Sequence, residues 1–256
     1  MSNAFDLKGL RALVTGGGTG IGRAIAAGLL DAGAAVTICG RRSAQVDEAV
    51  AALGDGGGMI RGTACDVTVE EDLQRLVDLA GDIDILVNNA GYARKDGWAD
   101  VTREQWREVM SVNVEAPLRL CQLLIPPMVE RGWGRVINVT SLYATLAPEP
   151  ARYPGADIDI PSYVASKHAL LGLTRHLAVA VSRQGVTVNA ISPGMVPDAQ
   201  ARPVSAEVIE ALAAGAPIGR VGTPEDLQTV ALFLASRKSG FVNGQNINVD
   251  GGWTTW

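Results

Sequence analysis

Residues 12–32, ALVTGGGTGIGRAIAAGLLDA, begin with an apolar strand pattern, continue through a glycine-rich turn and end in a helical pattern. Gly16, Gly20 and Gly22 remove side chains from the turn, so a bound anion can approach the backbone closely. Free backbone N–H groups and the positive end of the helix dipole face the same point. The stretch therefore predicts a strand, a pyrophosphate-binding turn and a helix, although a plain turn would account for one or two of the glycines.

Short β-branched runs alternate with helical patterns along the whole sequence. Such alternation is typical of an α/β fold with a parallel sheet and helices on both faces. No internal repeat, low-complexity tract or linker divides the chain, so we expect a single domain over residues 1–256. The expected strands cover residues 12–15, 36–39, 62–65, 83–87, 135–139, 186–191 and 245–249. The expected helices cover residues 20–32, 44–53, 70–80, 103–129, the region of Tyr163, and 224–234.

Two segments do not follow this alternation. Residues 142–161, LYATLAPEPARYPGADIDIP, are rich in proline and polar groups, and residues 195–217 are irregular with one short helical stretch. Both follow expected strand ends, where open α/β sheets bind their ligands. We therefore expect both segments to be loops at the substrate site.

The composition excludes several classes of protein. The 256 residues are 47% hydrophobic and include 30 glycines, which fits a well-buried core with many tight turns. A formal charge of −5 and a pI near 5.1 argue against a nucleic-acid or anionic-membrane partner. Cys39, Cys65 and Cys121 are far apart in apolar surroundings, without metal-ligand spacing, so we expect reduced thiols, no metal and a cytoplasmic location.

Tyr163 and Lys167 lie four residues apart in a helical pattern, so one turn brings the phenol and the ammonium onto the same face. A neighbouring ammonium favours the phenolate and should lower the pKa of the phenol, which suits proton exchange with a substrate oxygen. The alternative is a ring packed against the core with its neighbouring amine in water. The Tyr163–Lys167 pair indicates a catalytic site only in combination with the other motifs.

Five motifs together resemble the classical short-chain dehydrogenases/reductases, and the resemblance extends from about Leu7 to Trp253. They occur in the order and approximate spacing of that family, on the expected strand ends and helices. The motifs are TGGGTGIG at 15–22, NNAG at 88–91, Ser141 at the end of GRVINVTS, YVASK at 163–167 and SPG at 192–194. The resemblance implies a Rossmann-type, doubly wound sheet of about seven strands, a nicotinamide cofactor and a homotetramer, with a homodimer as the alternative.

The resemblance also assigns roles to four candidate catalytic residues. Tyr163 resembles the family's general acid/base, and Lys167 the residue that lowers its pKa and binds the nicotinamide ribose. Ser141 would hydrogen-bond the substrate oxygen, and Asn113 would hold a water in the proton path. A phenol and a hydroxyl donor suit this role because hydride addition to a carbonyl builds negative charge on oxygen.

Other residues with the same chemistry compete for these roles. Tyr143 and Tyr153 have no lysine four residues later, so neither has the ammonium neighbour. Thr140 has the same hydroxyl chemistry as Ser141, but alternation along a strand directs the two side chains to opposite faces. The family pattern favours Ser141.

The cofactor contacts carried over from the family follow the same strand ends. Asp66 resembles the adenine-contacting aspartate, although a helix-capping or turn role is an equal alternative, and Asn88 would be mostly structural. The full set of expected cofactor-binding residues is Gly16, Gly18, Thr19, Gly20, Ile21, Gly22, Arg41, Arg42, Asp66, Val67, Asn89, Ala90, Gly91, Tyr163, Lys167, Pro193, Gly194 and Val196.

The residues after the second expected strand favour NADP(H) over NAD(H). NAD-binding Rossmann sites have an acidic residue about 20 positions after the glycines, where it binds the ribose 2′-hydroxyl. This chain has Arg41 and Arg42 in that region and no carboxylate before Asp47. Guanidinium groups bind phosphate with two hydrogen bonds, so a 2′-phosphate is the expected ligand, with Arg41 the stronger candidate. The alternative is that both arginines only solvate the start of the next helix.

The substrate is less well determined, because the chain departs from the family pattern beside the site. Ser141 and Tyr163 are 22 residues apart, about nine more than is usual in the family. The extra residues bring Glu149, Arg152, Tyr153, Asp157 and Asp159, which would suit a hydroxylated substrate, unless most of them belong to a solvated loop. Asp198 stands near the place of a family threonine that contacts the nicotinamide side, which puts that contact in doubt.

Two histidines and two tryptophans complete the candidates. His168 and His176 lie eight apart on one helix without a third ligand, so we expect surface or interface residues and no metal site. Trp253 and Trp256 close the chain, and aromatic tails of this kind often anchor subunit contacts.

The sequence therefore predicts an NADP(H)-dependent oxidoreductase that interconverts a ketone and a secondary alcohol through a Ser-Tyr-Lys centre. The substrate would be a small carbonyl or alcohol compound, either a sugar-like or polyol-like hydroxy-ketone or a 3-oxoacyl thioester. An acyl-carrier substrate would need a basic docking surface, and Arg119, Arg131 and Arg135 are too scattered in the sequence to define one. The alternative function is a catalytically silent regulator that senses NADPH.

Overall fold

One parallel sheet of seven strands, in the order β3-β2-β1-β4-β5-β6-β7, organises the described part of the chain. The computed structural model describes residues 5–54, 59–153, 158–197 and 205–255. The strands are β1 (Arg11–Thr15), β2 (Ala35–Gly40), β3 (Ile60–Ala64), β4 (Ile85–Asn88), β5 (Gly134–Val139), β6 (Val186–Pro193) and β7 (Asn246–Val249). The expected doubly wound, Rossmann-type sheet is therefore confirmed.

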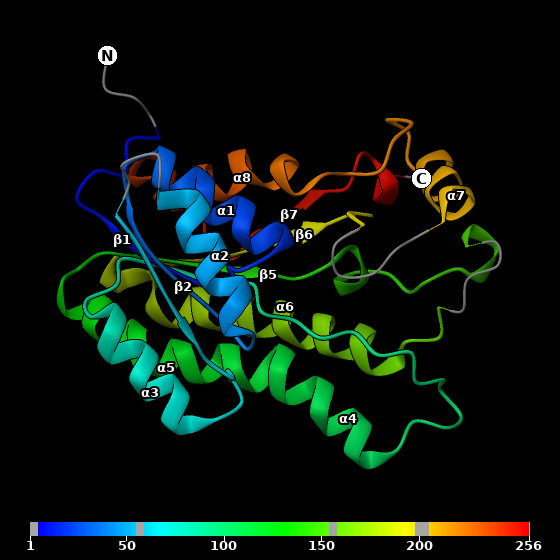
Figure 1. Cartoon of the computed structure of the whole chain (residues 1–256), viewed down its shortest axis with the longest axis horizontal. Helices are drawn as coiled ribbons and strands as arrows, with labels where there is room; N and C mark the ends of the chain where they lie inside the picture. Colours follow the sequence, from blue (N-terminus) through cyan, green and yellow to red (C-terminus); the bar gives the residue numbers. More distant parts are fainter. Residues whose placement is uncertain (1–4, 55–58, 154–157, 198–204, 256) are drawn as a thin grey trace.

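Helices cover both faces of this sheet (Figure 1). Helices α1, α2 and α8 lie on one face, and α3, α5 and α6 lie on the other. Alternate strand residues point to opposite layers: Val14 belongs to the first core and Leu13 to the second. The helices are α1 (Gly20–Asp31), α2 (Ser43–Gly54), α3 (Glu70–Ala80), α4 (Arg103–Met110), α5 (Ala116–Glu130), α6 (Pro161–Val181), α7 (Ala206–Ala214) and α8 (Gln228–Ala235).

The order of the strands reverses between β1 and β4. From β1 the chain proceeds outward to β2 and β3, then crosses back and builds β4 to β7 on the other side. Val14 pairs with Val87, and Asn88 pairs with Asn138, so the carboxyl ends of the central strands finish near the same edge. A crevice is expected outside these ends, at the point where the strand order reverses.

The expected helix 103–129 has an irregular turn in its middle. Helix α4 is followed by a π-helical turn, η1 (Ser111–Glu115), and then by α5. Asn113 lies within this turn and is fully buried. Hydrophobic periodicity predicted one continuous helix because a single wider turn hardly changes the pattern over 27 residues, and such turns are frequent at functional sites.

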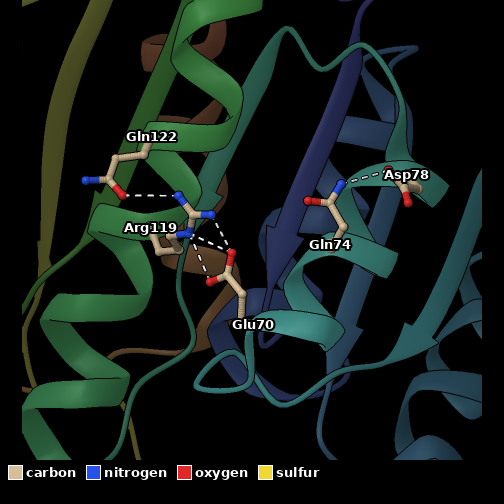
Figure 2. Close-up of polar contacts among 5 residues, drawn as sticks. All are labelled: Glu70, Gln74, Asp78, Arg119 and Gln122. Atoms are coloured by element: carbon tan, nitrogen blue, oxygen red, sulfur yellow. Dashed lines mark hydrogen bonds and ion pairs between the residues drawn. The ribbon is translucent and has the colours of Figure 1, made fainter.

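Helices α3 and α5 are joined by a charged contact on the outer surface of their layer. Figure 2 shows the guanidinium of Arg119 on α5 facing the carboxylate of Glu70, the first residue of α3. Nε of Arg119 donates to both carboxylate oxygens at 2.9 Å. Within α3, Gln74 donates to Asp78 one turn later at 3.0 Å. The positive charge of Arg119 is therefore already matched within the protein.

The three cysteines lie in the interior as free thiols, as expected for reduced core residues. Among the described residues, no group of three or more His, Cys, Asp or Glu side chains gathers as a metal site. His168 and His176 are both exposed on α6. None of the helices in the described ranges has the length and apolar character needed to cross a bilayer.

The glycine turn provides a test of the fold. A Cβ added at Gly22 would lie 2.2 Å from the backbone oxygen of Gly16. We expect Gly22→Ala to lower the free energy of unfolding by about 1–3 kcal/mol through overpacking, measured by urea denaturation. Gly172→Ala is the matched control: nothing lies within 4 Å of its Cβ position on α6, so it should be neutral or stabilising by up to about 1 kcal/mol. Equal stability of the two variants would contradict the close approach.

Candidate active site

A groove runs along the carboxyl ends of the strands and is formed by three adjoining cavities of about 830, 250 and 260 Å³. Gly91 lines all three, so the cavities lie next to one another at that residue. The structure places all of the expected cofactor residues along this groove. They are Gly16, Gly18, Thr19, Gly20, Ile21, Gly22, Arg41, Arg42, Asp66, Val67, Asn89, Ala90, Gly91, Tyr163, Lys167, Pro193, Gly194 and Val196.

The glycine turn after β1 is held open by Asn89. The side-chain amide of Asn89 donates to the backbone oxygens of Thr15 at 2.9 Å and Gly16 at 3.2 Å. A Cβ at Gly16, where φ is +64°, would lie 2.8 Å from this amide. The backbone of the turn therefore faces the groove without side chains above it, at the N-terminus of α1. This cradle fits a phosphate group.

Two guanidiniums lie at the far end of the groove, after β2. Arg41 and Arg42 are both exposed and line the 830 Å³ cavity together with Asp66. Within the described residues neither arginine side chain makes a hydrogen bond or ion pair. Two hydrogen bonds from Thr68 and the charge of Arg41 lower the pKa of Asp66, outweighing the opposite effect of its partial burial. The carboxylate therefore also stabilises a local turn, which was the alternative role.

Ser141, Tyr163 and Lys167 come together at the other end, in the 260 Å³ cavity. Ser141 follows β5, and its Oγ accepts the backbone N–H of Tyr143 at 3.1 Å. Tyr163 and Lys167 come from the first two turns of α6, with the ammonium nitrogen 5.6 Å from the centre of the phenol ring. Lys167 is only 3% exposed and donates to the backbone oxygen of Val139 at 2.9 Å. The alternative of an amine in water is therefore wrong.

Burial changes the proton affinities from those predicted by the sequence. The expected lowering of the Tyr163 pKa by Lys167 is not found. Burial raises the pKa of the Tyr163 phenol, and hydrogen bonding with Ser141 lowers it only in part. Burial also lowers the pKa of Lys167 to about 8, which weakens the ammonium that would stabilise a phenolate. Removal from water is therefore the largest influence on the pKa of both groups.

Asn113 is buried behind the groove, and its side chain contacts the backbone of a groove residue, Tyr92. Its side-chain oxygen accepts the N–H of Tyr92 at 2.8 Å, and its amide donates to the Tyr92 oxygen and to Ser166 Oγ, both at 2.9 Å. The hydroxyl of Ser166 donates in turn to the backbone oxygen of Tyr163 at 2.7 Å. The side chain of Asn113 therefore ties the segment after β4 to the start of α6.

The adjacent asparagines of NNAG have different positions. Asn89 lines the groove, whereas Asn88 is buried beneath it. The amide of Asn88 donates to the side chain of Asn138 at 2.8 Å, and Asn138 donates to Thr174 on α6 at 2.8 Å. These contacts join β4, β5 and α6, in agreement with the expected structural role of Asn88.

The extra residues between Ser141 and Tyr163 are not simply a solvated loop. Tyr153 is 7% exposed and packs against Trp253 with 5.9 Å between ring centres. Trp253 itself is 2% exposed, so its expected role as a subunit anchor is wrong: its own chain buries it. Asp159 accepts the backbone N–H of Trp98 at 2.9 Å. The expected contributions of Asp157, Asp198 and Trp256 lie outside the described residues.

Several groove residues were missed by sequence reasoning. Tyr92 and Ala93 line the groove directly after NNAG, and Gln45 and Cys65 line its far end. Ser166, within the YVASK motif, accepts a hydrogen bond from the side chain of Asn113. Tyr92 and Ala93 follow a strand end at the reversal of strand order, so position alone could have identified them. Gln45 and Cys65 carry no such signal.

Comparison with known families identifies the class of protein. A family described as enoyl-(acyl carrier protein) reductase matches residues 16–254. Together with the relatives below and the motifs of the groove, this match establishes that the chain belongs to the short-chain dehydrogenases/reductases, a family of oxidoreductases.

Three relatives cover almost the whole chain. It is 37% identical to 2-dehydro-3-deoxy-D-gluconate 5-dehydrogenase of Bacillus subtilis, over 99% of this chain and 98% of the relative. It is 33% identical to 3-oxoacyl-[acyl-carrier-protein] reductase FabG of Vibrio cholerae, over 97% and 98%. The crystal structure of a gluconate 5-dehydrogenase from Burkholderia cenocepacia, in complex with NADP and tartrate, is 34% identical, with a TM-score of 0.88 over 99% and 98% of the two chains.

The buried lysine predicts a pH dependence of stability. Between pH 8 and 10 the unfolded chain still holds the Lys167 proton, whose pKa is ordinarily 10.5, whereas the folded protein releases it. The free energy of unfolding should therefore rise over this range by about 1–2 kcal/mol, as measured by urea denaturation. Lys167→Met should lack the rise, and Lys238→Met, at an exposed lysine, should retain it. Parallel pH profiles for the wild type and Lys167→Met would contradict this prediction.

Proposed function

We propose that the protein is an NADP(H)-dependent dehydrogenase that interconverts a secondary alcohol and a ketone on a sugar acid related to gluconate. The observation that carries the reaction is the convergence of Ser141, Tyr163 and buried Lys167 at one end of the groove. The substrate class is supported by the relatives that act on gluconate derivatives.

The polar atoms at the cavity support separate roles for Ser141, Tyr163 and Lys167 in the proposed reaction. Ser141 Oγ accepts the N–H of Tyr143, which orients the Ser141 hydroxyl, and its proton would pass from its hydrogen bond with Tyr163 to the substrate oxygen. Tyr163 would exchange the proton with that oxygen, and its raised pKa keeps the phenol protonated for the reduction of a ketone. A bound nicotinamide would supply or accept the hydride. Lys167 uses one N–H on Val139, which leaves its other donors for a ribose and for the proton path.

Asn113 would contribute to the proton path through its backbone. Its side chain is occupied by Tyr92 and Ser166. Its carbonyl has no α-helical donor, because the residue four positions later is Pro117, which has no N–H. A carbonyl in this position can accept a hydrogen bond from a water, which is the role implied by the family resemblance.

The choice of NADP(H) rests on Arg41 and Arg42. Both guanidiniums lie at the end of the groove away from Tyr163, where neither makes a hydrogen bond or a close ion pair with a described residue, although Arg41 is near enough to Asp66 to lower the pKa of its carboxyl. Phosphate is the ligand that best matches such a pair. The Burkholderia cenocepacia enzyme, which binds NADP, supports the same choice.

The three arginines considered for docking give no support to a thioester on an acyl carrier protein, which favours a sugar acid. Arg119 is paired with Glu70, and Arg131 lies 3.4 Å from a carboxylate oxygen of Asp82. Arg135 is 3% exposed. None of the three arginines considered for docking therefore offers an unmatched exposed charge. By contrast, Arg152 of the extra segment lies over the ring of Trp253, without an ion pair to any described residue.

The domain organisation, the assembly and the location of the protein are also part of the proposal. We propose a single domain over the whole chain, a homotetramer in the cytoplasm, and no nucleic-acid partner. Light scattering of the purified protein tests the assembly directly.

The central test is NADP⁺ reduction and NADPH oxidation with gluconate, its keto and deoxy derivatives, a neutral polyol and an acetoacetyl thioester. We expect the gluconate derivatives to give the highest kcat/KM, and Tyr163→Phe to lose about 10²–10⁴-fold, because general acid–base catalysis contributes that much. Turnover that survives in Tyr163→Phe would contradict the mechanism. A preference for the thioester would contradict the substrate class. NADPH binding without any turnover would favour the silent regulator.

The cofactor assignment has its own test in direct binding. Arg41→Ala should weaken NADPH by about 1.5–3 kcal/mol, the value of a charge-assisted contact, and leave NADH nearly unchanged, as measured by fluorescence titration. Arg175→Ala, on the exposed face of α6, is the control for loss of one positive charge. Equal weakening of both cofactors by Arg41→Ala would show that this residue does not contact a 2′-phosphate.

A further inference from the structure

Two phenols from the segment between Ser141 and Tyr163 form a buried pair near the catalytic residues. The hydroxyls of Tyr143 and Tyr153 are hydrogen-bonded to each other, and each residue is 7% exposed. Their surroundings are apolar: the cluster also contains Leu142, Leu212 and Trp253. Neither tyrosine was expected to be the catalytic acid/base, because neither has a lysine one turn later.

The two hydroxyls have one more hydrogen-bond donor than the bond between them requires. Each phenol carries one O–H, and the hydrogen bond between Tyr143 and Tyr153 consumes only one of the two protons. Neither hydroxyl has another acceptor among the described residues. Burial raises the pKa of both phenols, so both stay protonated at neutral pH. A buried donor without an acceptor is costly, which favours a ligand oxygen at this place.

When Tyr153 is the donor in this hydrogen bond, the spare O–H belongs to Tyr143, which lies next to the catalytic residues. Tyr143 is two residues after Ser141, and its backbone N–H binds the Ser141 hydroxyl. Tyr163 packs against the same cluster, and after burial and the Tyr153 contact, the charge of an ionised Tyr163 also contributes to the raised pKa of Tyr143, so the two phenols are near each other. The substrate carbon must approach Ser141 and Tyr163, so its neighbouring groups come close to Tyr143.

We propose that Tyr143 is a specificity-determining residue that donates a hydrogen bond to an oxygen on the carbon next to the reacting carbon, and that Tyr153 is a positioning residue that orients it. The inference rests on the proposed function and specifies its substrate further. A sugar acid has a hydroxyl beside its keto group, which can accept this bond. A 3-oxoacyl chain has only CH₂ or CH₃ groups beside its keto carbon.

The test compares two substrates that differ in one hydroxyl: a hydroxy-ketone sugar acid and its analogue deoxygenated at the neighbouring carbon. Tyr143→Phe keeps the ring and removes the donor. It should lower kcat/KM for the hydroxylated substrate at least tenfold and change the deoxy analogue less than about threefold. Tyr153→Phe leaves the donor unoriented and should raise KM for the hydroxylated substrate with little change in kcat. Leu212→Ala, which disturbs the cluster without removing a hydroxyl, should affect both substrates equally.

Equal losses on both substrates, or no loss, in Tyr143→Phe would overturn the assignment. Measurement of equilibrium ligand binding distinguishes a failure of the Tyr143 assignment from a failure of the proposed function. In a Tyr163→Phe background, Tyr143→Phe should weaken equilibrium binding of the hydroxylated ligand to the NADP⁺ complex at least fivefold, without weakening the deoxy ligand. Such selective binding without wild-type turnover would overturn the proposed function and support the tyrosine assignment. Turnover with unchanged selectivity in Tyr143→Phe would overturn the tyrosine assignment alone, and absence of binding would overturn both.

Discussion

The parallel register of β1, β4, β5 and β6 is the constraint on which the rest of the site depends. Backbone pairing brings the ends of these strands to one edge, so that the glycine turn, NNAG, Ser141 and Pro193 emerge side by side. Helix α6 is then fixed against this edge by polar contacts, including Lys167 on the Val139 oxygen and Thr174 beneath Asn138. A slip of one residue in β5 would turn Ser141 away from the groove.

Local features of the site could be predicted from the sequence, and long-range ones could not. The glycine turn and the Tyr163–Lys167 spacing are set by neighbours within a few residues, so a motif describes them fully. The burial of Tyr153 depends on Trp253, which is 100 positions away, and no pattern within the extra segment reveals such a partner. The sequence therefore left two interpretations of the segment open, a loop that shapes the substrate site and a solvated loop.

The proton affinities and the π-helical turn were missed for different reasons. The spacing of Tyr163 and Lys167 gives their separation but not their exposure, and exposure decides the sign of the pKa shift. The π-helical turn around Asn113 shifts the apolar positions that follow it only slightly, so the long apolar pattern still resembles one continuous helix. Only the fixed position of Asn113 against the Tyr92 backbone shows why the helix widens there.

The cluster around Trp253 also constrains how this protein can be altered in evolution or by design. Its buried members come from three parts of the chain: residues 142–153, the region of helix α7 with Leu212 and Ala216, and the last turn of the described chain. Grafting the extra segment alone onto a shorter relative would leave its aromatic face without the tryptophan that covers it. A change of pocket shape would therefore require matched changes in all three segments, so these positions should be inherited together as one unit.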